Sequence, residues 1–288
     1  MFKFVIYKIG QFIVNYLPLD FSYGFASFVS TLQYHFSPRD RRAVRNNLKE
    51  ILPDPADDLA GKAKQVFQNF GKYLVEFFRM TQSIDRDFVH RHITVKNLPY
   101  LDDCLKRGKG VIVVTAHIGN WELGAMVLGL LGYPVVAIAL PHKERPVNEL
   151  FNKQREMKGV SVVPVQHAFR RCLEALKENK VVALVADRDF TSSGFLMDFL
   201  GKKAQIPKGP AIFSVRTGAP IVPSFLIRND DNTFSMTLEQ PIYPPMQEEG
   251  QIEDDVLQSV IRPYLAVIEQ RIRQYPTQWL MFRKYWVS

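Results

Sequence analysis

The sequence predicts an α/β fold in which helices flank a central, mostly parallel β-sheet and a hydrophobic helical segment comes first. Apolar runs of strand length alternate with helix-length segments from residue 93 to residue 274, as in the βαβ crossovers of a parallel sheet. Val111–Thr115 is an unbroken β-branched run and Val181–Ala186 is wholly apolar, which is typical of strands buried on both faces. The 288 residues suffice for one large domain, or for one domain with a small appendage.

The other elements follow from apolar periodicity and from the residues that break it. A helix is expected from Asp54 to Met80, because Phe67, Phe70 and Phe77 recur in it at helical spacing. Further strands are expected at Ile93–Val95, Tyr133–Leu140, Ser161–Val165, Pro220–Arg228 and Thr233–Leu238, and further helices at Leu98–Lys106, from about Trp121, and at Arg145–Lys158, Ala168–Asn179, Pro207–Thr217 and Asp254–Gln274.

The composition narrows the choice of partners. A net charge of +8 and a pI of about 9.4 suit nucleic acid, an anionic lipid surface or an acidic carrier protein. Nucleic acid is not expected, because the chain has no compact Lys/Arg block and no zinc-finger or helix–turn–helix signature. The two cysteines, Cys104 and Cys172, lack metal-ligand spacing, and disulfides are not the scaffold.

Residues 1–36 are rich in aromatic and aliphatic side chains, but Lys8, Asn15 and Asp20 interrupt them. No run reaches the roughly 18 apolar residues that a spanning helix needs, and no signal-peptide cleavage site follows. Two interpretations stay open. The segment packs as hydrophobic helices under the main domain, or it lies in a membrane interface with its aromatic side chains buried in lipid.

A basic cluster directly after this segment favours the membrane interpretation, because it would meet anionic headgroups. Its residues are Arg39, Arg41, Arg42, Arg45 and Lys49. The competing interpretation of the cluster is an ordinary solvated helix face. We therefore divide the chain into a membrane-associating helical segment at 1–52 and an α/β domain at 53–288.

The stretch after the first buried strand carries the candidate chemistry. His117 ends the strand, residues 118–120 form a tight turn, and Glu122 lies in the first turn of the next helix. Open α/β sheets place reactive groups at the carboxyl ends of their strands. At this spacing the Glu122 carboxylate is expected to fold back and hydrogen-bond the imidazole. A lone His in this position is usually structural, but the neighbouring Glu122 favours a functional pair.

The second buried strand also ends in charged residues, Asp187-Arg188-Asp189. If the two strand ends lie side by side, His117, Glu122 and Asp187 or Asp189 share one cleft. The loop that follows has an apolar tip at 194–201, and three lysines come after it. An apolar tip beside lysines suits a substrate with apolar and anionic parts. The competing interpretation is a surface loop folded on its own phenylalanines. The residues expected to contact substrate are Asn120, Trp121, Arg188, Asp189, Lys202, Lys203 and Lys208.

Ordered motifs along nearly the whole chain resemble the late acyltransferases of lipid A biosynthesis. The most specific is Ala116-His-Ile-Gly-Asn-Trp-Glu122, which matches that family's H-x-G-N-W-E signature. Residues 42–53 resemble its R-x-x-x-x-N-L motif, 186–189 its strand-end D-x-D, 218–225 the segment after its helix, and 276–286 its closing segment. The closing segment departs from the family's usual W-x-H-R-R, since this chain has Met281-Phe-Arg-Lys284. The chain is more distantly similar to glycerolipid acyltransferases that share H-x-x-x-x-D.

The resemblance implies a glycerolipid acyltransferase-like fold and acyl transfer from an acyl thioester to a hydroxyl, with no metal or redox cofactor. The donor would be acyl carrier protein or acyl-CoA. The acceptor would be a membrane glycolipid, a lipid A precursor in the main branch, at the cytoplasmic face of a bacterial inner membrane. Two alternatives stay open: an acyl-CoA-dependent phospholipid or mannolipid acyltransferase, and a non-catalytic lipid-binding protein.

The residues suit this chemistry. A hydroxyl needs a general base to attack a thioester, and His117 is the candidate, with Glu122 orienting it. Asp187 is expected to support the site, because an acid that ends a buried strand is costly without a purpose. No Ser or Cys nucleophile precedes His117, so direct transfer is expected. The candidate oxyanion donors are the backbone N–H groups at 119–121 and the guanidinium of Arg155.

Overall fold

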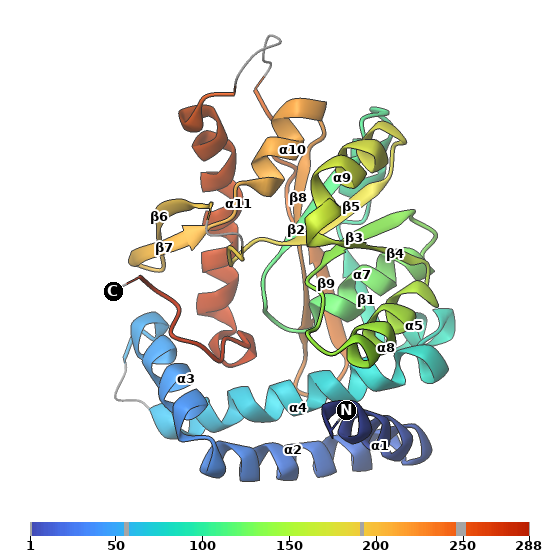
Figure 1. The fold of residues 1–288 in the computed structure, drawn as a ribbon, viewed down its shortest axis with the longest axis vertical. Coiled ribbons are helices and arrows are strands. Elements are labelled where there is room, and N and C mark those ends of the chain that lie inside the picture. Colours follow the sequence, from blue (N-terminus) through green and yellow to red (C-terminus); the bar gives the residue numbers. More distant parts are fainter. Residues whose placement is uncertain (1, 55–57, 191–192, 246–251, 288) are drawn as a thin grey trace.

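The computed structural model describes residues 2–54, 58–190, 193–245 and 252–287. Within these ranges, seven strands form one sheet in the order β1-β9-β8-β2-β5-β3-β4 (Figure 1). All neighbouring strands pair in parallel except β8 and β9. The strands are β1 (Ile93–Lys96), β2 (Val111–Thr115), β3 (Val135–Ala139), β4 (Val160–Pro164), β5 (Val181–Val185), β8 (Ile221–Arg228) and β9 (Phe234–Leu238). The predicted α/β fold with a mostly parallel sheet is confirmed.

The alternation of side chains along β2 divides the core between the two faces of the sheet. Ile112 and Val114 belong to the apolar core that includes α9, α10 and α11, and Val111 and Val113 to the core that includes α5, α6, α7 and α8. The helices are α5 (Arg86–His92), α6 (Pro99–Leu105), α7 (Trp121–Leu130), α8 (Arg145–Glu156), α9 (Ala168–Lys177), α10 (Gly209–Thr217) and α11 (Asp254–Gln274).

Three segments differ from the sequence-based expectation, and the first of them, helix α5, was not predicted at all. The helix predicted at 54–80 is α4 (Leu59–Ser83), which begins where the Asp58 side chain accepts from the Gly61 N–H, and residues 55–57 lie outside the described ranges. The loop with an expected apolar tip is instead an antiparallel hairpin of β6 (Phe195–Phe199) and β7 (Lys202–Ile206). Its odd-numbered β6 side chains are buried and belong to the same apolar core as α9, α10 and α11, and the Phe199 ring contacts Tyr285 of the C-terminal segment.

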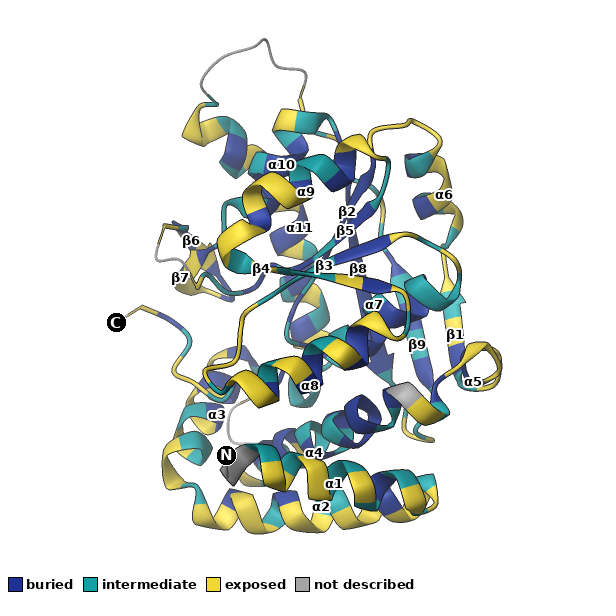
Figure 2. Cartoon of the chain, turned by 45° about the vertical axis from the view of Figure 1, so that its right-hand side comes forward, coloured by how far each residue is buried: buried dark blue, intermediate teal, exposed yellow. Residues whose placement is uncertain are grey.

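Three helices precede α4: α1 (Phe2–Tyr16), α2 (Leu19–Phe36) and α3 (Pro38–Ile51). Helices α1 and α2 lie side by side beneath α4, on the side away from the sheet (Figure 1). Tyr23 and Tyr34 of α2 are buried, whereas the opposite side of α1 and α2 is exposed (Figure 2). This segment therefore packs against the domain and also presents an apolar face to solvent. Among the described residues, no helix is both long and apolar enough to cross a membrane.

Helix α4 lies across the carboxyl ends of β2 and β8. The Tyr73 ring stacks on Trp121 at 4.8 Å between centroids, directly after β2. Glu76 pairs with Arg228, the last residue of β8. This edge of the sheet is therefore enclosed between the strands above and the layer of α1, α2 and α4 below.

The segment that follows α11 closes the same edge. The Leu280 N–H donates to the His117 carbonyl at 2.8 Å, and the Gly119 N–H donates to the Gln278 carbonyl at 3.0 Å. The Asn47 side-chain amide of α3 donates to the carbonyls of Met281 and Arg283 at 3.0 and 2.7 Å. Motifs from both ends of the sequence thus meet around the turn after β2.

Candidate active site

His117 and Asp187 lie together because β2 and β5 are paired in parallel register. Thr115 pairs with Val185, so the residues two positions beyond each strand face one another. The imidazole Nδ1 of His117 lies 2.7 Å from Asp187 Oδ1, and the His117 backbone N–H donates to Asp187 Oδ2 at 3.0 Å. The predicted meeting of the two strand ends is confirmed.

Asp187 is completely buried, and its remaining contacts come from the C-terminal segment. Trp279 Nε1 donates to Oδ2 at 3.1 Å, and the Tyr285 hydroxyl donates to the Asp187 backbone carbonyl. Burial favours the neutral form of this carboxyl, but electrostatic attraction to His117 and the hydrogen bonds from His117 and Trp279 outweigh burial and hold the pKa of Asp187 below its usual value. The carboxylate is therefore ionised and accepts from Nδ1–H.

The His117 imidazole keeps one side toward solvent. Its side chain is 21% exposed, with the Trp121 ring edge-on at 5.0 Å and the Phe190 ring at 6.3 Å between centroids. Because Asp187 fixes the proton on Nδ1, Nε2 is the basic nitrogen. The arrangement presents a base between aromatic side chains, which suits removal of a proton from a hydroxyl on an apolar substrate.

The sequence-based expectation for Glu122 was wrong in its partner. Glu122 forms a bidentate ion pair with Arg155 of α8, with Nε to Oε2 at 2.7 Å and Nη2 to Oε1 at 2.5 Å. Both side chains are largely buried, and Glu122 outweighs the effect of burial to raise the pKa of Arg155 above its ordinary value. The first turn of α7 therefore directs this carboxylate toward α8, and Asp187 takes the position beside the imidazole.

The turn between β2 and α7 is fixed by backbone contacts. Gly119 has φ +60°, and a Cβ placed there would lie 2.0 Å from the Leu226 carbonyl oxygen, so only glycine fits. The Gly119 and Asn120 N–H groups donate to the carbonyls of Gln278 and Leu226. These two amides, expected as oxyanion donors, are thus occupied by the fold itself.

Asn120 was expected to contact substrate, but its side chain is buried and points into the protein. Its Oδ1 accepts from the Leu123 N–H at 2.9 Å and caps α7, while its Nδ2 donates to Glu76 at 2.5 Å. Glu76 also accepts from the Tyr23 hydroxyl and pairs with Arg228. Asn120 therefore ties the start of α7 to α4.

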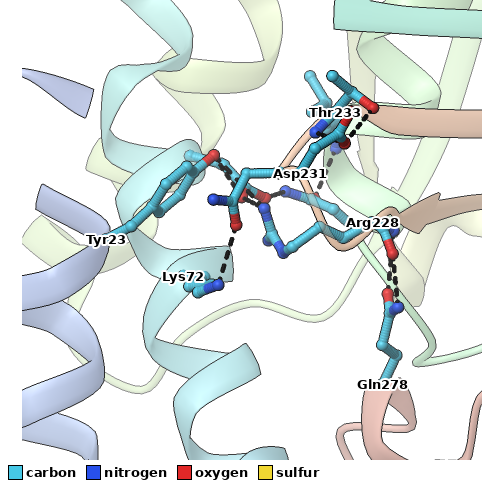
Figure 3. Close-up of polar contacts among 10 residues, drawn as sticks. Tyr23, Lys72, Arg228, Asp231, Thr233 and Gln278 are labelled. Atoms are coloured by element: carbon cyan, nitrogen blue, oxygen red, sulfur yellow. Dashed lines mark hydrogen bonds and ion pairs between the residues drawn. The ribbon is translucent and has the colours of Figure 1, made fainter. Parts of the chain in front are cut away.

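Figure 3 shows the surroundings of this buried network. Lys72 donates to Asn232 at 2.9 Å beside the Tyr23 ring. The Gln278 side-chain amide makes two hydrogen bonds with the Arg228 backbone, at 3.0 and 2.8 Å. Elements from four parts of the chain are thus joined under the turn that positions His117.

The remaining residues expected to contact substrate are spread over several elements. Arg188 lies over the Phe190 ring at 4.4 Å, and Asp189 accepts from the Gly194 N–H at 2.8 Å. The three lysines pair with acids on different elements: Lys202 with Glu50 at 2.7 Å, Lys203 with Asp198 at 2.9 Å and Lys208 with Asp254 at 3.5 Å. Only Trp121 and Phe190 have rings in contact with the His117 ring in the described part of the chain.

A family model described as "Bacterial lipid A biosynthesis acyltransferase" matches residues 1–288. The chain belongs to this family. A phosphatidylinositol mannoside acyltransferase of Mycolicibacterium smegmatis is 25% identical over 250 residues, which cover 85% of this chain and 79% of the relative. A lipid A biosynthesis palmitoleoyltransferase of Escherichia coli is 24% identical over 256 residues, which cover 86% and 79%.

One solved structure, the 1-acyl-sn-glycerophosphate acyltransferase PlsC of Thermotoga maritima, aligns with a TM-score of 0.41 and 15% identity over 86% of this chain and 97% of that chain. The family and its named relatives make this protein an O-acyltransferase, with an acyl donor and a lipid acceptor. Acyl transfer to a glycolipid is the activity that these names share.

In this acyltransferase, the sequence analysis did not predict the residues that bond to Asp187 and Asn120 on the buried side of the site. Trp279 and Tyr285 lie in the closing segment that the family resemblance singled out, but their contact with Asp187 spans about a third of the chain. Glu76 could have been predicted from the sequence, because it is an acid between apolar residues on a helix whose aromatic stripe faces the core.

Proposed function

We propose that the protein transfers a fatty acyl chain from an acyl thioester to a hydroxyl of a membrane glycolipid, with His117 as the general base and Asp187 as its orienting partner. The observation that carries this proposal is the His117–Asp187 contact at the carboxyl ends of β2 and β5. It matches the logic of a catalytic triad, in which a buried carboxylate fixes the imidazole tautomer.

In the proposed reaction Nε2 of His117 removes the acceptor hydroxyl proton while the hydroxyl oxygen attacks the thioester carbonyl. The tetrahedral intermediate then collapses, the C–S bond breaks, and the imidazolium returns the proton to the leaving thiolate. Asp187 stabilises the imidazolium between these steps. Direct transfer needs no enzyme nucleophile, and the two cysteines, Cys104 and Cys172, are both buried in the core.

The proposed donor is acyl carrier protein. The chain carries a net charge of +8, which favours association with an acidic carrier. Comparing transfer rates from acyl carrier protein and from acyl-CoA tests this choice. Equal rates at matched concentrations would contradict it.

The proposed acceptor is a lipid A precursor, acylated on a hydroxyl of a chain already attached to its glucosamine disaccharide. A phosphatidylinositol mannoside is the second candidate, because a relative of that name is 25% identical over 85% of this chain. Incubating purified protein with one labelled donor and both acceptors decides between them. Label in neither lipid would contradict both.

A membrane acceptor requires the enzyme to reach a bilayer, and we propose that residues 1–52 supply the contact at the cytoplasmic face of a bacterial inner membrane. The exposed apolar side chains of α1 and α2 form one surface, and α3 places basic residues beside it. Burial of apolar side chains and attraction of basic residues to anionic headgroups act together in such monotopic binding.

Replacement of the base tests the mechanism. His117→Ala should lower turnover about 100-fold or more, the usual worth of a positioned general base. Asp187→Ala should also be severe, and the double variant should be little worse than the worse single one, because the two residues act as a unit. Turnover is measured with labelled donor, and circular dichroism verifies that each variant folds. Near-wild-type transfer by folded His117→Ala would exclude the mechanism.

A further inference from the structure

A cavity of about 470 Å³ lies between α1 and α8, beside the end of α4. Its polar lining includes Lys8, Asn15, Lys153 and Gln154. None of the residues that contact the His117 imidazole lines this cavity, so it is separate from the proposed catalytic site.

Two amides in the lining lack the partners that buried polar groups normally have. Gln154 is 1% exposed, yet neither its Nε2 nor its Oε1 has a hydrogen-bond partner among the described residues. The buried Oδ1 of Asn15, on the facing helix, also has none. Because buried polar groups are almost always paired, this lining offers donors and acceptors suited to a polar ligand.

The charge of the lining selects the sign of that ligand. Lys8 and Lys153 line the cavity, and no acidic side chain is among its described lining residues. Two ammonium groups beside neutral amides suit a phosphate that also carries hydroxyl groups.

The apolar part of the lining would place the cavity at the lipid surface in the membrane attachment proposed above. Phe12 and Tyr16 of α1 line it and are 64% and 76% exposed, and they continue the apolar face of α1 and α2. Figure 2 shows α8 directly above α1, with exposed residues along both helices. A ligand headgroup in the cavity would leave its acyl chains beside these aromatic rings.

We propose that this α1–α8 cavity binds the phosphate-bearing headgroup of an anionic phospholipid and so orients the enzyme on the membrane. The lysines attract the phosphate, Gln154 Nε2 donates to a phosphate oxygen, Gln154 Oε1 and Asn15 Oδ1 accept from headgroup hydroxyls, and the acyl chains stay in the bilayer. The proposal concerns membrane binding and does not depend on the acyl-transfer mechanism.

Gln154→Met gives the sharpest test, because it removes the amide without changing charge or size much. Binding is measured by co-sedimentation with vesicles of phosphatidylcholine, with and without phosphatidylglycerol. The variant should bind the phosphatidylglycerol vesicles about tenfold more weakly, the usual effect of losing a hydrogen bond to a charged group. Binding to pure phosphatidylcholine should be unchanged, and the melting temperature should be equal or higher.

Charge is tested separately with a matched pair. Lys153→Gln should weaken binding to phosphatidylglycerol vesicles. Lys177→Gln, which replaces another exposed lysine at the end of α9, should change it little. If folded Gln154→Met keeps wild-type preference for phosphatidylglycerol, or if both lysine variants behave alike, the proposal is wrong. If inorganic phosphate alone stabilises the protein as well as a short-chain phosphatidylglycerol does, the cavity binds small anions and the lipid assignment fails.

Discussion

At the scale of single residues, the proposed reaction depends on an asymmetric pair. Asp187 is completely buried, whereas the His117 side chain keeps about a fifth of its surface exposed, at 21%. The buried member is held by four hydrogen-bond contacts from two segments and has little freedom to move. In the proposed mechanism the exposed member would meet the substrate in a fixed orientation, so the base would already be oriented for the reaction.

The lowered pKa of Asp187 predicts how stability depends on pH. A carboxyl whose folded-state pKa lies below its unfolded value of about 3.9 contributes stability above that pH and loses it as pH falls through the folded-state pKa. Asp187→Asn lacks this contribution, so its unfolding free energy should fall less than that of the wild type when the pH drops below about 4. Urea unfolding at a series of pH values measures the unfolding free energies of the wild type and of Asp187→Asn. Parallel curves would contradict the prediction.

The Glu122–Arg155 pair predicts a loss of stability when it is broken. Glu122→Gln leaves the Arg155 charge buried and poorly compensated, which should cost about 3–5 kcal/mol of unfolding free energy. Adding Arg155→Met should restore much of it. Glu149→Gln, which breaks the exposed pair with Arg145 at 2.7 Å, is the control and should change stability little. If Glu122→Gln keeps its stability and loses activity, Glu122 acts in catalysis instead.

The sequence predicted which residues gather at the site better than which atoms bond. His117 and Asp187 each follow an apolar strand, and parallel strands bring such ends together. The partner of His117 depends on the register of β2 against β5 and on the direction of the first turn of α7. Neither can be predicted from the local sequence. The five-residue spacing predicted a contact between Glu122 and His117. In the structure the Glu122 carboxylate instead pairs with the guanidinium of Arg155 on α8.

At the scale of elements, the seven strands of the main sheet and the helices α4 and α6 to α11 were predicted within about five residues because their apolar periods are strong, whereas the short helix α5 was not predicted. Helix α11 has the predicted bounds, Asp254–Gln274. The β6–β7 hairpin was missed because its alternation is short and was taken for a loop. Docking of the C-terminal segment against the turn after β2 could not be predicted, since that contact is set by tertiary packing.

The turn after β2 predicts a position that tolerates no side chain. Gly119→Ala places a Cβ against the Leu226 carbonyl oxygen at 2.0 Å in addition to straining a φ of +60°, so the turn must move. We expect a loss of more than about 2 kcal/mol of stability together with a large fall in turnover. Gly108→Ala is the control, with φ +71° but open space around the added Cβ, and should cost about 1 kcal/mol. Equal losses in the two variants would mean that backbone strain alone matters.

At the scale of the whole molecule, the site lies between the sheet and the helical layer that would face a membrane. Helix α4 contacts the site through Tyr73 and Glu76 on one side and packs against α2 on the other. An acceptor embedded in a bilayer under α1 and α2 would be separated from His117 by two layers of helices, first α1 and α2 and then α4. Because α4 packs against α2 and also contacts the residues around His117, it fixes the position of the proposed membrane face relative to the base.

The exposed face of α2 allows membrane binding to be tested without unfolding the protein. Deleting residues 1–36 would remove Tyr23 from its buried bond with Glu76, so deletion would confuse anchoring with stability. Phe25 and Phe28 are 43% and 62% exposed, and replacing both with Ser should leave the melting temperature nearly unchanged. Transfer of apolar surface from water to lipid should then fall enough to weaken vesicle binding about tenfold.

The control for this double variant is Phe169→Ser, which removes a 50% exposed aromatic ring from α9, far along the chain from the proposed membrane face. It should bind vesicles as the wild type does. Activity completes the argument, because the α2 variant should lose transfer to an acceptor in vesicles but keep it on acceptor dispersed in detergent, where no surface needs to be found. If the Phe169 variant is the one released from vesicles, the enzyme meets the membrane through a different face and the acceptor reaches His117 from the side of α9.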